Sequence, residues 1–434
     1  MKLYPHQVDA LKRLENYNRC ALYWDMGLGK TFGGSEKAIE LGENILVVCQ
    51  KSKVNDWFNH FLDNYVGCNT CDLTKVKERD LNSFIGTSLR HQGEKHYWKY
   101  SVWIINYDLI WRRDVLSKLR NFTLLLDESS LIQNETTKRS KFILQSLNPT
   151  NVILLSGTCV SGKYERLWSQ CRLLGWRISK KDFYNRYCIQ EPIYKWNGQP
   201  MKNAYGGIIT RIVGYKNVEE LKQKLRDFGA IFMKTEEVID LPEQTFIDIN
   251  VDVTKEFIKF EKTKLVEVEG KTLVGDTSLT ELLYQRMLCS QYNKEKLKSF
   301  EDLIDSTSDR LIVFYNFNEE LDKMKSVVGD RPISIVNGST RDLKAYEECD
   351  DSITFVQYQA GAMGLNLQKA NKIIYFSPTL SCEMYMQSLK RVHRLNQANP
   401  CFYYLMKSGI DNEIYEALQR GVDYTNELFV KAFS

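Results

Sequence analysis

The chain has 434 residues, of which 43% are hydrophobic and 26% are charged, and its formal net charge at pH 7 is +4. This is the composition of a globular protein with about two or three domains. No apolar run reaches the roughly 18 residues of a membrane helix, the N-terminal segment lacks the apolar core of a signal peptide, and the eleven cysteines are scattered and odd in number. These features argue against a membrane span and a disulfide framework, and we expect a protein of the reducing cytoplasm.

The small net charge hides an asymmetry along the chain. Residues 301–434 contain 14 Lys and Arg against 19 Asp and Glu, a balance of −5, whereas residues 1–300 have a balance of +9. Basic regions attract anionic polymers. If such a polymer binds, we expect residues 1–300 to provide most of the attraction; an unevenly solvated surface is the alternative.

A glycine-rich segment, DMGLGKT (residues 25–31), follows the first apolar run, Ala21–Trp24, and opens a helical pattern. When a strand is followed by a glycine turn and the start of a helix, successive backbone N–H groups converge on one spot. The helix dipole strengthens the attraction of an anion to that spot. Lys30 then reaches the terminal phosphates of a nucleotide, and Thr31 offers its hydroxyl to Mg²⁺. The general pattern has a glycine where this chain has Trp24, so an ordinary glycine-rich helix entry is the alternative.

Apolar runs alternate with helical stretches through the first part of the chain. The runs after the first are Ile45–Cys49, Val102–Ile105, Phe122–Leu126 and Val152–Leu155. Helical periodicity lies between them, for example in Val54–Leu62 and Tyr164–Leu174. This alternation is typical of a parallel sheet covered by helices.

An acidic pair, Asp127-Glu128, follows the run Phe122–Leu126 directly. Ligands of α/β proteins gather at the carboxyl ends of strands. Asp127 is therefore a candidate to hold Mg²⁺, and Glu128 a candidate to orient or deprotonate a water, as phosphoryl transfer requires. A strand-end acidic pair without function is the alternative.

A second set of apolar runs begins near residue 311: Leu311–Tyr315, Ile333–Val336, Ile353–Gln357, Lys372–Phe376 and Phe402–Leu405. The sequence therefore predicts an α/β protein with two lobes, residues 1–240 and 301–434. Residues 241–300, mostly helical and charged, are expected to form a linker between them. Residues 189–217, rich in Gly and Pro, are expected to form a long loop or hairpin.

A helix is expected to start in the second lobe with Ser381 as its N-cap. Gln387, Arg391 and Arg394 follow at i, i+4 and i+7, so they share one face of a helix. Two such arginines suit the γ-phosphate of a nucleotide, where arginine fingers contribute about 10³–10⁵ in rate. A solvated basic face is the alternative, but the phosphate loop and acidic pair favour a composite site between the lobes.

In these blocks and several others the chain resembles helicase-like ATPases of superfamily 2, specifically the Swi/Snf-type DNA translocases. The first-lobe blocks are LYPHQ (3–7), DMGLGKT (25–31), ILVVCQKSKVNDWFNHF (45–61), WIINYDLI (103–110), LLLDESSLIQN (124–134) and LLSGT (154–158). The second-lobe blocks are LIVFYNF (311–317), IVNGST (335–340), GAMGLNLQKAN (361–371) and QSLKRVHRLNQ (387–397). The resemblance implies two RecA-like lobes, each a mostly parallel sheet flanked by helices, with ATP and Mg²⁺ as cofactors.

The resemblance also implies roles for individual residues. Gln7 reads the adenine, and ATP is held by Asp25, Met26, Gly27, Leu28, Gly29, Lys30, Thr31 and Gln387. The resemblance implies that the catalytic residues are Lys30, Glu128, Arg391 and Arg394. It implies that Mg²⁺ is held by Thr31 and Asp127. Small polar groups at turns suit a sequence-independent grip on phosphates, and the nucleic-acid candidates are Lys51, Ser52, Asn55, Trp57, Asn106, Tyr107, Asn316, Gly338, Ser339 and Gln359. Core packing is the alternative for Trp57. Coupling of hydrolysis to movement falls to Ser156, Gly157, Thr158, Gly364 and Asn366.

The chain departs from the family pattern at the residues that link hydrolysis to movement. The usual DEAH sequence is replaced by Asp127-Glu128-Ser129-Ser130, so no histidine couples this box to the second lobe. Ser156 is present where the family usually has a threonine, and Tyr358-Gln359 where it usually has a Thr-Arg pair. The residues of phosphate chemistry are all kept. We therefore expect hydrolysis, and leave its coupling to movement open.

A set of possible zinc ligands lies outside these blocks. Cys68 and Cys71 are followed by His91 and His96. The gap between the two pairs exceeds the usual spacing of zinc fingers. Surface histidines in a Lys-rich loop are therefore the stronger interpretation, and zinc the weaker one.

The combined expectation is an ATP-dependent motor that moves on or remodels duplex DNA without sequence preference, as a monomer. By analogy with compact relatives we expect it in a bacterial or virus-infected host cell, in DNA repair, replication or recombination. Two alternatives remain open. One is a non-translocating ATP switch that clamps nucleic acid or a partner protein, and the other is a strand-separating helicase.

Overall fold

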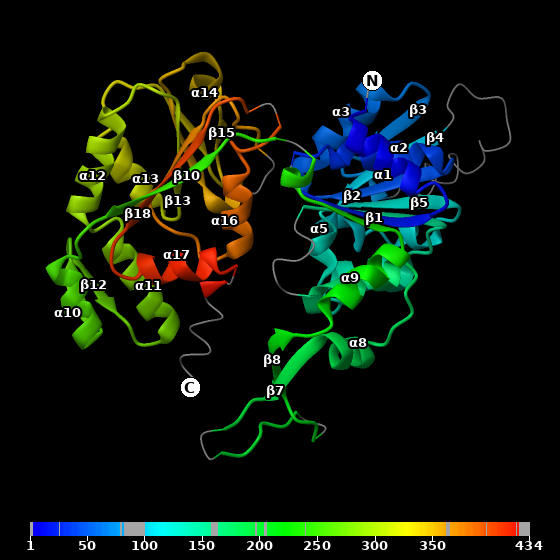
Figure 1. The fold of residues 1–434 in the computed structure, drawn as a ribbon, viewed down its shortest axis with the longest axis horizontal. Helices are drawn as coiled ribbons and strands as arrows, with labels where there is room; N and C mark the ends of the chain where they lie inside the picture. The colour runs from blue at the N-terminus through cyan, green and yellow to red at the C-terminus, as the bar shows by residue number, and fades with distance from the viewer. Residues whose placement is uncertain are drawn as a thin grey trace. The chain divides into compact units, whose positions relative to one another are not determined.

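The structure is a computed structural model that describes residues 3–25, 27–78, 80–81, 100–157, 164–195, 198–203, 206–238, 240–361, 365–395, 397–421 and 423–424. The chain divides into two compact units, Met1–Val238 (unit 1) and Ile239–Ser434 (unit 2). Each unit has its own seven-stranded sheet (Figure 1). Among the described residues, no helix combines the length and the hydropathy that crossing a membrane requires.

The sheet of unit 1 is parallel throughout, with the strand order β3-β4-β2-β5-β6-β1-β9. Its strands are β1 (Arg19–Trp24), β2 (Asn44–Cys49), β3 (Cys68–Asp72), β4 (Tyr100–Asn106), β5 (Phe122–Asp127), β6 (Asn151–Ser156) and β9 (Ala230–Met233). The five apolar runs predicted in this part of the chain are its five inner strands. Those predictions are confirmed, and β3 and β9 form the two edges.

Helices cover both faces of this sheet (Figure 1). They are α1 (Pro5–Arg13), α2 (Lys30–Glu40), α3 (Val54–Asn64), α5 (Tyr107–Ile110), α6 (Lys138–Lys141), α7 (Trp168–Leu173), α8 (Lys180–Tyr187) and α9 (Val218–Asp227). Short 3-10 turns occupy Lys51–Lys53, Asp114–Lys118, Ser129–Ile132, Tyr164–Leu167 and Thr235–Glu237, and Phe142–Ser146 forms a π-turn. The helix expected over residues 54–62 is α3, which buries Val54, Trp57 and Phe61 at i, i+3 and i+7.

Helix α2, which follows the glycine-rich loop, packs closely on the sheet through two glycines. A Cβ atom added to Gly33 would lie 2.9 Å from the Trp24 ring, and one added to Gly34 would lie 2.9 Å from the Leu155 side chain. The buried Lys37 ammonium donates to Leu14 O at 2.7 Å and to Glu40 Oε1 at 2.8 Å, which ties α2 to the end of α1. Trp24, which replaces a glycine of the general phosphate-loop pattern, is thus accommodated by Gly33 on the helix.

An arm projects from unit 1 (Figure 1). Its stem is the antiparallel pair β7 (Cys188–Pro192) and β8 (Thr210–Tyr215). This confirms the hairpin expected over residues 189–217.

The sheet of unit 2 has the order β10-β18-β17-β13-β16-β14-β15 and is parallel except for the β14–β15 pair. Its strands are β10 (Gln244–Asn250), β13 (Leu311–Tyr315), β14 (Ile333–Val336), β15 (Arg341–Asp342), β16 (Ile353–Gln357), β17 (Lys372–Tyr375) and β18 (Cys401–Lys407). Its helices are α10 (Lys255–Thr263), α11 (Ser278–Cys289), α12 (Lys294–Asp305), α13 (Asn318–Lys325), α14 (Lys344–Glu348), α15 (Tyr358–Gly361), α16 (Cys382–Leu389) and α17 (Asp411–Gln419), with a hairpin of β11 (Leu265–Val268) and β12 (Lys271–Val274). All five apolar runs predicted here are strands.

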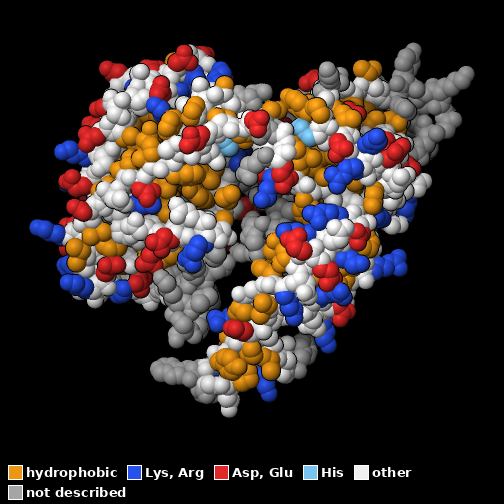
Figure 2. Space-filling view, viewed as in Figure 1, with side chains coloured by type: hydrophobic (Ala, Val, Ile, Leu, Met, Phe, Trp, Pro, Cys, Tyr) orange, Lys and Arg blue, Asp and Glu red, His pale blue; other side chains and the backbone are white. Residues whose placement is uncertain are grey.

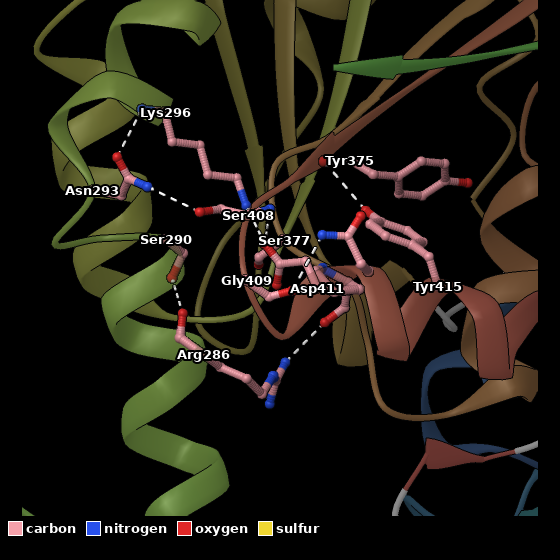
Figure 3. Close-up of polar contacts among 12 residues, drawn as sticks. Arg286, Ser290, Asn293, Lys296, Tyr375, Ser377, Ser408, Gly409, Asp411 and Tyr415 are labelled. Carbon is pink, nitrogen blue, oxygen red and sulfur yellow. Dashed lines mark hydrogen bonds and ion pairs between the residues drawn. The ribbon is translucent and has the colours of Figure 1, made fainter. Parts of the chain in front are cut away.

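Residues 241–300, expected as a separate linker, are an integral part of unit 2. Strand β10 pairs with β18 along its whole length. Buried polar contacts fasten the following helices to α17 (Figure 3): the Lys296 ammonium donates to Asp411 Oδ2 at 2.6 Å, and the Asn293 amide donates to Ser408 Oγ at 3.1 Å. Breaking a buried ion pair by removing one partner costs about 3–5 kcal/mol. These contacts therefore require the segment to fold together with unit 2.

Candidate active site and nucleic-acid groove

Five parallel strands of unit 1 end at one edge of the sheet, and candidate residues follow each of them. The register places Tyr23 beside Ser156, and Cys49 beside Asn106. The inner strands lie in the order β4-β2-β5-β6-β1. The ends of β5, β6 and β1 therefore bring together the acidic pair, Ser156 and the glycine-rich loop. The ends of β4 and β2, which lead to the nucleic-acid candidates, lie directly beside them.

The glycine-rich loop has the predicted strand, turn and helix start. Gly27 and Gly29 have φ angles of 91° and 73°, the left-handed region that glycine enters without steric cost. A Cβ atom at Gly29 would also lie 2.1 Å from Gln7 Nε2. The Lys30 ammonium donates to Trp24 O at 2.9 Å and to Asp25 O at 3.1 Å. The Lys30 ammonium is thus held by backbone carbonyls of the loop itself. Met26 lies outside the described residues.

Two residues expected to contact ATP hold the loop in place. The Gln7 amide donates to Leu28 O at 3.2 Å and to Gly29 O at 3.3 Å, and Gln7 is only 2% exposed. Asp25 Oδ2 accepts from the Thr235 N–H at 3.2 Å. Gln7 therefore joins α1 to the loop, and Asp25 joins the loop to the segment after β9.

Asp127 is half-buried, and aromatic side chains from two neighbouring elements bond its carboxylate and its backbone carbonyl. The Trp57 indole on α3 donates to Asp127 Oδ2 at 2.8 Å, and the Tyr107 hydroxyl after β4 donates to Asp127 O at 2.9 Å. Burial raises the pKa of Asp127, while the Trp57 bond and the Lys30 charge act to lower it. Trp57 and Tyr107 are each 2% exposed. Both side chains are thus packed inside unit 1, which favours the core-packing alternative given for Trp57 and extends it to Tyr107.

Glu128 is fixed by hydroxyl groups at two of the positions where the chain departs from its family pattern. Its backbone is left-handed, with φ 55° and ψ 59°. Ser130 and Ser156 both donate to Glu128 Oε1, at 3.0 and 2.9 Å. Ser129, the other serine of the acidic box, donates instead to Gln170 Oε1 at 2.9 Å. A serine therefore occupies the place of the missing histidine and bonds the glutamate directly.

The chemistry of these side chains fits Mg·ATP. The glycine-rich loop ends at the N-terminus of α2, where backbone N–H groups favour anions such as phosphates. Thr31 and Asp127 offer the hydroxyl and carboxylate oxygens that Mg²⁺ prefers. A bound cation would also compensate the burial of the Asp127 carboxylate.

Replacing Trp57 by phenylalanine is expected to weaken Mg²⁺-dependent nucleotide binding by about 10–100-fold, the usual effect of losing an outer hydrogen bond to a metal ligand. The variant keeps an aromatic ring in the core but removes the indole N–H that orients Asp127. The measurement is the affinity for a fluorescent ATP analogue over a Mg²⁺ titration. Phe61→Leu, a buried change on the same helix, is the matched control. An unchanged Mg²⁺ midpoint in the Trp57 variant would show that the indole does not orient the metal ligand.

A groove of about 590 Å³ lies beside the acidic pair, at the ends of β2, β3 and β4. It is lined by Lys51, Val54, Asn55, Asp72, Thr74, Lys75, Asn106, Asp108, Leu109 and Arg112. Lys51, Asn55 and Asn106 were predicted nucleic-acid contacts; Ser52, also predicted, is half-buried and does not line it. Lys75 and Arg112 add two cations that sequence reasoning missed. Lys75 follows β3 and Arg112 follows α5. Neither loop has a motif or a hydrophobic periodicity that would have indicated a binding role.

The arginines of unit 2 do not share a helix face with Gln387. Helix α16 ends at Leu389, so Gln387 lies on the helix, whereas Arg391 and Arg394 lie in the turns after it. Arg391 is 2% exposed and donates to Leu365 O at 3.3 Å. Arg394 is partly exposed, and burial lowers its pKa. The chain leaves the helix because its last carbonyls bond within the turns, including Arg391 N–H to Ser388 O.

The remaining candidates of unit 2 differ in accessibility. Gly338, Ser339, Gln359 and Asn366 are exposed. The Asn316 amide donates to Ser377 Oγ at 2.8 Å and to Pro378 O at 3.0 Å, so it braces two strand ends. In unit 1, Gly157 is half-buried. Thr158 and Gly364 lie outside the described residues.

Cys68 and Cys71 do not form a chelating pair. Both lie on β3, where residues three apart point to opposite faces of the sheet. Burial raises the pKa of each thiol, which disfavours the thiolate that binds zinc. His91 and His96 lie outside the described residues, and among those described no group of three or more His, Cys, Asp or Glu side chains is placed to hold a metal ion.

Comparison with known proteins places the chain among helicase-like ATPases. The SNF2-related domain matches residues 6–297, and the helicase conserved C-terminal domain matches residues 295–396. A SWI/SNF-related matrix-associated actin-dependent regulator of chromatin subfamily A-like protein 1 homolog of Caenorhabditis elegans is 22% identical over 98% of this chain and 62% of its own length. The putative ATP-dependent helicase/translocase YwqA of Bacillus subtilis is 24% identical over 86% of this chain and 42% of its own length.

A solved structure, the Sulfolobus solfataricus SWI2/SNF2 ATPase core in complex with dsDNA, covers 97% of this chain and 91% of that chain at 17% identity, with a TM-score of 0.43. The present chain spans between about a third and two thirds of the length of the curated relatives named here and of the related Arabidopsis thaliana protein CHR12, a probable ATP-dependent DNA helicase. The SNF2-related match nevertheless covers more than half of the chain. The chain therefore belongs to the SNF2-related family of helicase-like ATPases.

Proposed function

We propose that the protein is an ATP-driven motor that hydrolyses ATP and moves on or remodels DNA. The observation that carries this proposal is the shared sheet edge of unit 1. There the phosphate loop, the Asp127-Glu128 pair and a groove with three cations follow neighbouring strands. Family membership supports the same activity.

In this proposal the residues of unit 1 divide the work of hydrolysis. Lys30 and the loop N–H groups hold the phosphates, and Thr31 and Asp127 hold Mg²⁺, which would neutralise phosphate charge. Glu128 accepts a proton from the attacking water. Ser130 and Ser156 orient its carboxylate.

Arg394 and Gln387 of unit 2 are proposed to complete the site when ATP binds, with the buried Arg391 supporting the fold around them. Gly338, Ser339 and Gln359 are proposed to contact the nucleic-acid backbone from that unit. The protein would act as a monomer on duplex DNA without sequence preference, in repair, replication or recombination.

Two short connections join the groove to the acidic pair and give DNA-stimulated hydrolysis a physical route. Asn55 lines the groove, and Trp57, two residues further along α3, bonds Asp127. Asn106 lines the groove, and the adjacent Tyr107 bonds Asp127 O. Nucleic acid that settles α3 and the end of β4 would therefore favour one arrangement of the metal ligand.

A non-translocating ATP switch is the second candidate, and the departures from the family pattern favour it. Ser130, in place of the coupling histidine, bonds Glu128 within unit 1. Tyr358, in place of a threonine, donates to Ser377 O at 3.2 Å within unit 2. Both side chains are thus engaged inside their own units.

Duplex DNA is expected to stimulate ATP hydrolysis more than single-stranded DNA or RNA. The triple variant Lys51→Ala, Lys75→Ala, Arg112→Ala is expected to raise the DNA concentration for half-maximal stimulation by about tenfold or more, because each lost phosphate contact weakens binding and lowers the salt dependence. Hydrolysis is measured with each nucleic acid over a salt series.

The matched control removes three exposed cations of unit 1 that do not line the groove, Lys118, Lys141 and Lys224. It should respond to DNA like the parent protein. Hydrolysis that ignores saturating duplex DNA but rises with RNA or a partner protein would contradict the motor and support the switch.

A further inference from the structure

At the end of the arm of unit 1, three backbone hydrogen bonds hold together segments that then diverge. Beyond the β7–β8 stem, the Ile193 N–H donates to Ile209 O at 2.9 Å, the Ile209 N–H to Met201 O at 2.8 Å, and the Met201 N–H to Ile193 O at 2.7 Å. These three residues, spaced eight apart, close a ring from which two short prongs emerge. We call the described residues 192–195, 198–203 and 206–210 the fork (Figure 1).

Each prong is held by its own main-chain bonds. The Lys195 N–H donates to Gln199 O, and the Asn203 N–H to Gly207 O, both at 2.8 Å. The stem is anchored in turn, since the Tyr215 hydroxyl bonds Glu165 and the Tyr187 hydroxyl donates to Glu220 at 3.0 Å. Main-chain hydrogen bonds and the anchored stem therefore hold the described residues of the fork in place.

Large apolar side chains on the arm face solvent. Tyr194 is 57% exposed and Ile208 is 52% exposed, and Met201, Ile189 and Val213 are also exposed. Figure 2 shows hydrophobic side chains gathered on this arm. Such a patch on an element that contributes little to the core marks an interaction site.

The charge of the fork restricts what that site binds. Residues 193–209 contain Lys195 and Lys202 and no acidic residue, and both lysines are exposed. On the stem, Glu191 is neutralised by Arg211 at 3.6 Å. The occupant must therefore offer negative charge together with apolar surface.

Apolar and cationic side chains share one face of the fork. Tyr194 lies opposite Pro200, and Lys202 lies opposite Ile208. Directly opposed residues of an antiparallel bridge share a face, so Ile208 lies beside Lys202 and Tyr194 lies beside Pro200. Unpaired nucleic acid matches this face, because its bases expose flat apolar surfaces beside phosphates. A duplex stacks its base faces inward and presents only phosphates, sugars and base edges.

We propose that the fork binds an unpaired nucleic-acid strand beside the DNA on which the motor acts. The proposal rests on the proposed function. Tyr194 and Ile208 contact base faces, and Lys202, which lies opposite Ile208, contacts a phosphate. The fork would thus favour substrates that carry a junction between paired and unpaired strands.

The experiment measures the affinity of the full chain for a labelled single-stranded oligonucleotide and for a blunt duplex of equal length over a salt series. Tyr194→Ser with Ile208→Ser should raise the ratio of single-strand to duplex dissociation constants about tenfold or more, since each stacked base contributes roughly 1–3 kcal/mol. Lys202→Ala should flatten the single-strand salt dependence by a log–log slope of about 0.7, the value for one phosphate contact. Lys259→Ala with Lys262→Ala, two exposed lysines of α10, is the control and should match the parent.

A crosslinking measurement covers the case in which a variant misfolds. A single strand that contains 5-iodouracil should crosslink the parent protein in the tryptic peptide that ends at Lys195. Parent-like dissociation constants in both fork variants, or an equal loss for both DNA forms, would overturn the fork proposal and leave the motor intact. A parent protein that binds neither DNA form would instead refute the proposed function.

Discussion

Replacing Glu128 by glutamine is expected to lower the rate of ATP hydrolysis by about 10²–10⁴-fold, the contribution typical of a positioned general base. Glutamine keeps the shape of the side chain, and its amide oxygen still accepts from Ser130 and Ser156. The change therefore removes the proton acceptor and leaves the phosphate loop and metal ligands in place. ATP should remain bound without being hydrolysed, which a single-turnover assay and a nucleotide-binding titration measure together.

Two comparisons separate this effect from a general loss of the site. Lys30→Ala should lower both ATP affinity and turnover, because the terminal phosphates lose their cation. Ser130→Ala with Ser156→Ala should lower turnover less than Glu128→Gln does, since the base remains and only its orientation is lost. Glu219→Gln, an exposed change on α9, should have no effect. Near-normal turnover in Glu128→Gln would remove that residue from the role of activating water.

The inner strands could be predicted from the sequence because both of their faces are buried. Strands such as β2 and β5 read as unbroken apolar runs, which is typical of parallel sheets covered on both sides. The edge strands escaped prediction. The sequence of β3 is CNTCD, and β10 alternates between exposed and half-buried residues, so neither forms an apolar run. Because β10 was not predicted as a strand, residues 241–300 were expected to form a separate linker, whereas β10 joins this segment to the sheet of unit 2.

The site was predictable where a motif fixes local backbone, and less so where side chains meet across the fold. The phosphate loop and the acidic pair lie at strand ends, as their spacing indicated. Trp57 and Tyr107 were assigned to nucleic acid, yet both turn inward to Asp127. A local pattern does not show which face of α3 meets β5. The two serines on Glu128 likewise come from different strand ends, and only the sheet order brings them together.

The two arginines of unit 2 are in different surroundings, although their spacing suggested equal roles. Helix α16 ends before either of them. Arg391 is buried and bonds Leu365 O, so it supports the fold around it. Arg394 is partly exposed, and its guanidinium is desolvated enough to lower its pKa. A cation that is partly removed from water interacts strongly with an anion brought next to it.

Replacing Arg394 by alanine is therefore expected to lower ATP turnover by about 10³-fold or more while nucleotide affinity stays close to that of the parent, as for the loss of an arginine finger. Affinity is kept because the phosphate loop belongs to unit 1, whereas the arginine acts on charge that develops in the transition state. Arg391→Ala should lower turnover too, but with a lower melting temperature, because it removes a buried contact. Arg420→Ala, an exposed arginine after α17, is the control. Turnover, affinity and melting temperature are measured for all three variants, and parent-like hydrolysis in Arg394→Ala would show that unit 2 does not supply the finger.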